Sequence, residues 1–199
     1  MKVLVHVCCG PCSPHLLRRL REEGHGVATL FYNPNIHPYT EFKARAEAAR
    51  KYCEGEGMEF MLREDYDVFD FTRRALETMD AGDDRCGYCY RLRMRGAAGE
   101  ARERGFEAFT STLLASPYQK HEMARHIGEE EAGKAGVAFL YMDFREGWKE
   151  ARRVSFEKEM YHQKYCGCIF SEQERWLGEK GKEKGKEKRT ETGKEKQDK

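Results

Sequence analysis

The sequence lacks a long apolar run and a net charge of either sign. No stretch approaches the roughly 20 apolar residues that a transmembrane helix needs, and no charged and then apolar segment typical of an export signal precedes Val3. The 36 Lys and Arg residues oppose 35 Asp and Glu residues, which leaves a formal charge of +1. We therefore expect a cytoplasmic protein without a membrane partner, on which a polyanion would need a local basic patch.

The charged residues are unevenly distributed along the chain. Residues 178–199 contain no apolar side chain and repeat Gly-Lys-Glu-Lys three times, a composition typical of disorder. The remaining length suffices for one sizeable α/β domain. We expect a single α/β catalytic domain with a metal cluster over residues 1–177, followed by a disordered Lys- and Glu-rich tail over residues 178–199.

Short apolar runs alternate with helical patterns in the domain. The first, Val3–Val7, is typical of a buried strand, and a cysteine-rich turn follows it before a helix that begins at Pro14. Four more strands are expected, at residues 26–32, 58–62, 106–110 and 137–142. The alternation predicts an α/β fold: one doubly wound, mainly parallel five-stranded sheet, Rossmann-like and similar to ATP-pyrophosphatase (HUP) domains, with extra C-terminal helices. The loops after the strands should converge at one edge, where such sheets bind ligands.

Eight cysteines stand out in a chain without an export signal, where metal or redox chemistry is more typical than a disulfide framework. Cys53 is isolated on an expected helix, so we interpret it as an ordinary thiol. A Cys-x-x-Cys pair allows both thiolates to reach one metal from a tight turn. The other seven cysteines form three clusters: Cys8, Cys9 and Cys12; Cys86 and Cys89; Cys166 and Cys168.

The thiols leave the identity of the metal open. Soft thiolate ligands favour zinc or iron–sulfur centres over magnesium or calcium. A structural zinc site uses four ligands, so seven thiols imply either two centres or a redox role for some of them. A [4Fe-4S] cluster takes four thiolates, which can come from Cys8, Cys9, Cys86 and Cys89. The remaining three thiols, Cys12, Cys166 and Cys168, are candidates for ligands of a second metal. Cys166 and Cys168, in the Cys-Gly-Cys segment, are alternatively candidates for a small, reducible disulfide.

Several other polar residues are candidates for the site. His6 lies in an apolar strand, where a core role is more typical than metal ligation. His37 is equally consistent with a proton donor and with a plain loop hydrogen bond. Tyr118 and Asp143 follow the fourth and fifth expected strands, which places them near the site edge. The arginines after Cys89 either solvate a helix face or contact phosphates: Arg91, Arg93, Arg95, Arg102 and Arg104.

Longer motifs surround these residues: His6-x-Cys8-Cys9-x-Pro11-Cys12, Phe31-Tyr-Asn-Pro-Asn-Ile-His-Pro-Tyr39, Arg85-Cys86-x-x-Cys89-Tyr90, Ser111-Thr-Leu-Leu114, Ser116-Pro-Tyr-Gln119, Asp143-Phe-Arg145 and Gln163-x-Tyr-Cys166-Gly-Cys168-x-Phe-Ser171. With them, the chain resembles the cobalamin-independent epoxyqueuosine reductase family over most of residues 3–171. This family reduces epoxyqueuosine to queuosine at the wobble position of certain tRNAs, the last step of that modification. The resemblance implies an oxidoreductase that acts on tRNA and takes electrons from an external donor.

The resemblance also implies a set of site residues. A [4Fe-4S] cluster is expected on Cys8, Cys9, Cys86 and Cys89, beside a second redox group or mononuclear iron built from Cys166 and Cys168, with the role of Cys12 open. Asp143 or Tyr118 is our hypothesis for the proton donor. Substrate contacts are expected from the loop after the second strand and from two arginines: Asn33, Asn35, His37, Arg91 and Arg145.

Two other functions are consistent with parts of the sequence. A zinc-stabilised RNA-binding module without catalysis would account for thiols and arginines, but not for seven thiols at the functional edge of the sheet. An ATP-pyrophosphatase-like tRNA-modifying enzyme would carry a Ser-Gly-Gly-x-Asp-Ser loop after the first strand. The loop here is Cys-Cys-Gly-Pro-Cys-Ser, so the glycines and the aspartate for pyrophosphate and magnesium are absent.

Overall fold

In the computed structural model, which describes residues 1–178, five strands form one parallel sheet in the order β3-β2-β1-β4-β5. The central strand pairs on both sides, with His6 opposite Leu30 and Ser111. Its apolar residues are fully buried on both faces, as expected for parallel strands covered by helices. The strands are β1 (Lys2–His6), β2 (Gly26–Tyr32), β3 (Glu59–Arg63), β4 (Ala108–Ser111) and β5 (Ala138–Phe139).

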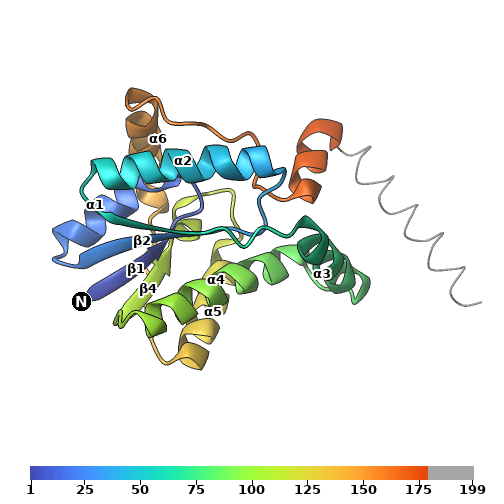
Figure 1. Cartoon of the computed structure of the whole chain (residues 1–199), viewed down its shortest axis with the longest axis horizontal. Coiled ribbons are helices and arrows are strands. Elements are labelled where there is room, and N and C mark those ends of the chain that lie inside the picture. The colour runs from blue at the N-terminus through green and yellow to red at the C-terminus, as the bar shows by residue number, and fades with distance from the viewer. Residues whose placement is uncertain (179–199) are drawn as a thin grey trace, which may run out of the picture.

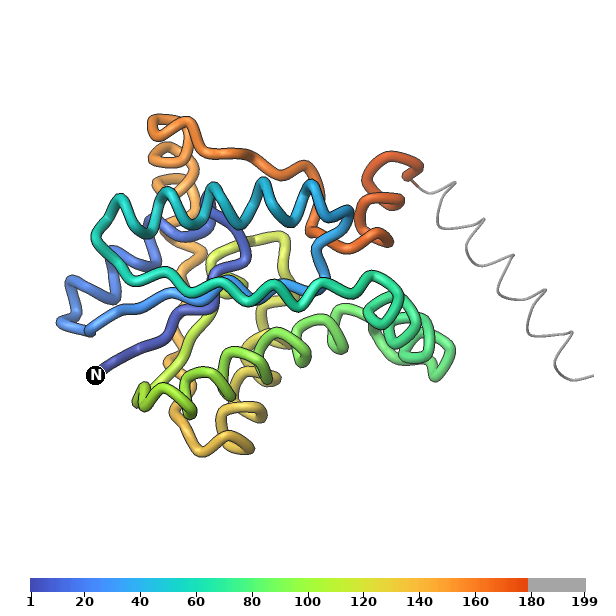
Figure 2. The backbone as a smooth tube through the Cα atoms, in the orientation of Figure 1, coloured from blue at the N-terminus to red at the C-terminus, as the bar shows by residue number. Residues whose placement is uncertain are grey.

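Helices cover both faces of the sheet, which confirms the predicted doubly wound fold. Figure 1 shows α1, α2 and α6 on one face and α4 and α5 on the other. The helices are α1 (Pro14–Glu22), α2 (Tyr39–Gly55), α3 (Val68–Asp80), α4 (Arg85–Glu103), α5 (His121–Ala135) and α6 (Trp148–Glu157). A further helix begins at residue 169. The chain after α6 runs back along α2 to reach it (Figure 2).

Two elements differ from the sequence prediction. Strand β5 is shorter than the expected 137–142, because the Tyr141 amide bonds back to Phe139 O instead of extending the ladder. The helix expected after Cys89 begins earlier, at Arg85, so that Cys86 and Cys89 lie within α4 near its N-terminus, because Asp84 caps the helix by accepting a hydrogen bond from the Cys86 amide at 2.8 Å. The predicted disordered tail lies almost wholly outside the described residues. Within residues 1–178, no helix is long and apolar enough to span a membrane.

Helix α4 approaches the sheet closely at Gly96. A Cβ at this position would lie 2.1 Å from Tyr32 Cε1 on β2. We expect Gly96→Ala to lower the free energy of unfolding by about 1–3 kcal/mol, because the added methyl overpacks this contact. The matched control is Gly99→Ala on the same helix, where a Cβ meets nothing within 4 Å and Ala raises stability by up to about 1 kcal/mol. Urea unfolding measures both, and equal effects would contradict this packing.

Candidate functional site

Three cysteines gather immediately after β1. The loop makes one 3₁₀ turn over Gly10–Cys12, and Pro at its start pre-sets the backbone. The Sγ atoms of Cys8, Cys9 and Cys12 all lie within 4.8 Å of one another. Cys9 and Cys12 are buried and Cys8 is half-buried. Three soft donors at this spacing can bind one metal ion.

Hydrogen bonds polarise this triad. Thr112 Oγ1 accepts from the Cys8 amide at 2.9 Å and donates to Cys8 Sγ at 3.1 Å, while Gln163 Nε2 donates to Cys9 Sγ at 2.9 Å. Hydrogen bonds from Cys12 and Cys9 lower the pKa of Cys8 well below its ordinary value. Burial raises the pKa of Cys9, and the hydrogen bond with Cys8 raises that of Cys12. The metal-free triad therefore favours one thiolate, at Cys8.

The second pair of thiols lies in the first turn of α4. Burial raises the pKa of Cys86 to about 11 and the pKa of Cys89 to about 12. Both are therefore neutral thiols at pH 7 in the absence of a metal. Cys89 packs in a small apolar cluster with Cys168 and Phe71. A metal that replaces these protons would bind in a largely water-free position.

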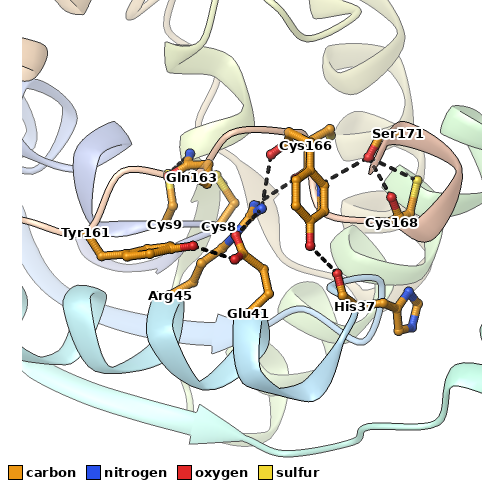
Figure 3. Close-up of polar contacts among 12 residues, drawn as sticks. Cys8, Cys9, His37, Glu41, Arg45, Tyr161, Gln163, Cys166, Cys168 and Ser171 are labelled. Carbon is orange, nitrogen blue, oxygen red and sulfur yellow. Dashed lines mark hydrogen bonds and ion pairs between the residues drawn. The ribbon is translucent and has the colours of Figure 1, made fainter. Parts of the chain in front are cut away.

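The third pair, Cys166 and Cys168, is held by a buried arginine on α2 (Figure 3). Arg45 Nη1 donates to Cys166 O at 2.9 Å and its Nη2 donates to Tyr165 O at 3.0 Å. Glu41, one turn earlier on α2, accepts from Arg45 Nε at 2.7 Å. The charged clamp fixes the backbone of the Cys-Gly-Cys segment against α2, although 120 residues of chain separate the two.

The side chains of this segment diverge from the clamp. Cys166 is exposed, and Gln119 Nε2 approaches its Sγ at 3.6 Å. Gln119 is oriented by Tyr90 on α4, whose hydroxyl donates to Gln119 Oε1 at 2.8 Å. Cys168 is buried, with Ser171 Oγ 3.5 Å from its Sγ. All cysteine thiols of the chain are free in the structure.

Contacts between their segments connect the three thiol clusters. Gln163, three residues before Cys166, donates to Cys9 Sγ at 2.9 Å, and Cys89 packs in the same apolar cluster as Cys168. Arg93, on α4, is buried beside Cys89, and its Nε donates to Cys89 O at 3.2 Å.

The loop after β2 contains three predicted substrate residues, and all are buried. Asn33 Nδ2 donates to Val7 O at 2.9 Å. Both amide atoms of Asn35 and both ring nitrogens of His37 lack a hydrogen-bond partner among the described residues. Burial lowers the pKa of His37 to about 4, so its ring is neutral at pH 7. His6 is a core residue, as interpreted from the sequence: burial lowers its pKa to about 4.

The remaining predicted site residues lie on the surface. Arg145 forms a two-pronged ion pair with Asp143 and lowers the pKa of that carboxyl to about 2. Arg91 is paired with two carboxylates of α5 rather than free. Tyr118 is 79% exposed, and its ring meets Trp148 edge-on at 5.8 Å between centroids.

Sequence reasoning missed several contacts around the cysteines. Arg45, which binds the carbonyls of Tyr165 and Cys166, was not among the candidates, and Arg93, which binds Cys89 O, was a candidate only for solvation or phosphate contact. Gln119 and Gln163 lie within the longer motifs, which was the available signal, but nothing in the sequence shows their contacts with sulfur. The same holds for Thr112, which also lies within a longer motif. Its hydroxyl contacts Cys8 because β4 pairs with β1, and the sequence does not show this pairing.

Comparisons with known proteins give one description for a family model and for several relatives. The family model described as "Epoxyqueuosine reductase QueH" matches residues 3–174. Proteins of that name are similar to the chain in Thermotoga maritima, with 36% identity over 87% of this chain and 91% of the relative, and in Dehalococcoides mccartyi, with 35% identity over 88% and 94%. A third, from Helicobacter pylori, is 34% identical over 85% of this chain and 49% of its own length.

Proposed function

Because the chain belongs to the epoxyqueuosine reductase QueH family, it is an oxidoreductase of tRNA queuosine biosynthesis, and we propose that an iron–sulfur centre on its clustered thiols delivers the electrons. The reaction removes the epoxide oxygen as water and leaves an alkene, which consumes two electrons and two protons. The observation that supports the proposal is the triad of Cys8, Cys9 and Cys12 after β1, together with the contacts that connect its segment to the two other thiol pairs. The substrate is tRNA, the electron donor is external, and we place the reaction in the cytoplasm.

We propose that four thiols hold a [4Fe-4S] cluster: Cys8, Cys9, Cys86 and Cys89. The fit is supported by the donor set, which is entirely soft, and by the burial of Cys9 and Cys89. Because burial raises the pKa values of Cys86 and Cys89, a metal would have to displace their protons on binding. When bound, such a cluster supplies electrons one at a time. The other three thiols are proposed to form a second iron site or a redox pair: Cys12, Cys166 and Cys168.

The residues around this centre suggest how substrate is bound and protonated. Tyr118 is exposed and precedes Gln119, whose side chain approaches Cys166. Asp143, in contrast, is a carboxyl group whose pKa Arg145 lowers further, to about 2, so that it is ionised at neutral pH and cannot donate a proton there. We therefore favour Tyr118 as proton donor and assign Asp143 to the orientation of Arg145 toward the substrate. Asn35 and His37 have amide atoms and ring nitrogens without a hydrogen-bond partner among the described residues, but both side chains are buried, so a hydrogen bond to the modified nucleoside requires the loop after β2 to expose them.

One assay tests this function and its proton donor. Anaerobic protein, a chemical reductant and tRNA carrying epoxyqueuosine are expected to yield queuosine, detected by mass spectrometry of the digested nucleosides as the loss of one oxygen. Tyr118→Phe is expected to slow the conversion by about a hundredfold, the usual size of a general-acid contribution. Tyr52→Phe, on the far end of α2, is the matched control and should convert at the normal rate. If Tyr118→Phe and Asp143→Asn both keep full activity, neither is the donor.

A further inference from the structure

Arg93 is the largest of the fully buried side chains, at 2% exposure. It lies one helical turn after Cys89 on α4, and its Nε donates to Cys89 O at 3.2 Å. Its Nη2 has no hydrogen-bond partner among residues 1–178. A guanidinium is always charged, and burial without a counter-ion is strongly unfavourable. The fold therefore buries a positive charge that requires a negatively charged partner.

The surroundings of Arg93 identify the source of that negative charge. The structure places Arg93 beside the thiol pair of α4: its Nε donates to Cys89 O at 3.2 Å, and its guanidinium lies 5.5 Å from the centre of the Tyr90 ring. Arg95 of the same helix behaves differently, since it is exposed and pairs with Glu131 at 3.1 Å. A divalent metal bound by three or more thiolates carries a net negative charge. Such a centre would complement the buried guanidinium.

We propose that Arg93 is the built-in counter-charge of an anionic thiolate–metal centre, which strengthens metal binding and raises the reduction potential of a redox-active centre. The effect on the potential follows because each added electron makes the centre more negative, so a fixed positive charge stabilises the reduced state more than the oxidised state. Arg93 acts through the thiols and is a positioning residue. Only the part that concerns the potential rests on the proposed iron–sulfur function.

The test uses Co²⁺ as a probe, because its thiolate complexes absorb in the visible and form whether or not the natural centre contains iron. Metal-free full-length protein is titrated under reducing, anaerobic conditions. We expect Arg93→Met and Arg93→Gln to weaken Co²⁺ binding at least about tenfold, the size of one unit charge acting over roughly 12 Å at an effective dielectric constant of about 20. Arg93→Lys keeps the charge and should bind within a few-fold of the natural protein.

Arg95→Met is the matched control, since it removes a charge of the same helix that is 65% exposed and already paired with Glu131. It should leave Co²⁺ affinity unchanged. Circular dichroism confirms that each variant is folded, and Arg93→Gln retains a polar side chain in case Arg93→Met does not fold. Equal loss of affinity in Arg93→Lys and Arg93→Gln would overturn the proposal in favour of a packing role, as would normal affinity in Arg93→Gln.

The reconstituted protein gives a second readout. The midpoint potential of its centre, followed by electron paramagnetic resonance during a redox titration, should fall in Arg93→Gln and stay close to normal in Arg93→Lys. An unchanged potential in Arg93→Gln would refute the electrostatic role in redox tuning. If no iron centre forms in the natural protein, the iron–sulfur function fails, while the Co²⁺ titration still decides the role of Arg93.

Discussion

Cys89→Ser is expected to abolish both iron binding and epoxyqueuosine reduction, with a loss of activity of at least about a hundredfold. The loss of a residue that only orients a metal ligand already reduces metal affinity or activity about 10- to 100-fold, and this change removes a proposed ligand. Serine replaces a soft sulfur donor by a hydroxyl that iron–sulfur clusters do not favour. Iron content and visible absorbance of the anaerobically reconstituted protein, together with the tRNA assay, measure the effect.

The matched control is Cys53→Ala. Cys53 is also buried, and burial raises the pKa of its thiol to about 11, but it lies on α2 apart from the three clusters. Iron content and activity should remain normal in this variant. Retention of iron and activity in Cys89→Ser would remove Cys89 from the proposed ligands, and loss of iron in Cys53→Ala would show that burial rather than ligation decides the outcome.

Gly167→Ala is expected to lower activity by about tenfold or more while the fold is kept. Gly167 has a φ of +145°, which L side chains rarely adopt, and strain of this kind costs about 1–3 kcal/mol. Its added Cβ would lie 3.1 Å from Ile36 Cγ1 and 3.2 Å from Asn35 Nδ2. Relief of this contact would move the Cys166–Cys168 segment away from the loop after β2. The tRNA assay, combined with thermal unfolding, separates the local effect from global unfolding.

Gly82→Ala provides the comparison for backbone strain alone. Gly82 also has a positive φ, of +85°, but a Cβ there meets nothing within 4 Å. We expect Gly82→Ala to lose a similar amount of stability and to keep full activity. If Gly82→Ala and Gly167→Ala reduce activity equally, the close fit of Gly167 against Ile36 and Asn35 has no part in the reaction.

The sequence predicts the sheet and its functional edge because their determinants are local. The buried run Val3–Val7, the alternation with helical patterns and the positions of the loops suffice for a parallel sheet whose carboxyl edge collects the cysteines. Strand β5 was predicted too long, since the apolar run continues past Phe139 while the backbone turns back on itself. The core role of His6 was predictable from its apolar neighbours.

The contacts that organise the thiols could not be read from the sequence. Arg45 and Arg93 have the same appearance as surface arginines in a helical pattern, yet both are 2% exposed. The contacts of Arg45 come from a segment that is distant in sequence, Tyr165 and Cys166, which a helical pattern does not reveal. The ion pair between Arg145 and Asp143 is local, but it changes the interpretation of Asp143 from a proton donor to a carboxylate.

The central claim is that the clustered thiols hold an iron–sulfur centre. The most direct test is metal analysis and an absorbance spectrum of protein purified without oxygen and reconstituted with iron and sulfide. The account predicts a brown protein with a broad visible band and about four or more irons per chain, as a [4Fe-4S] cluster requires. A colourless protein that binds only zinc after reconstitution would contradict it and leave a zinc-stabilised RNA-binding module as the better description of these thiols.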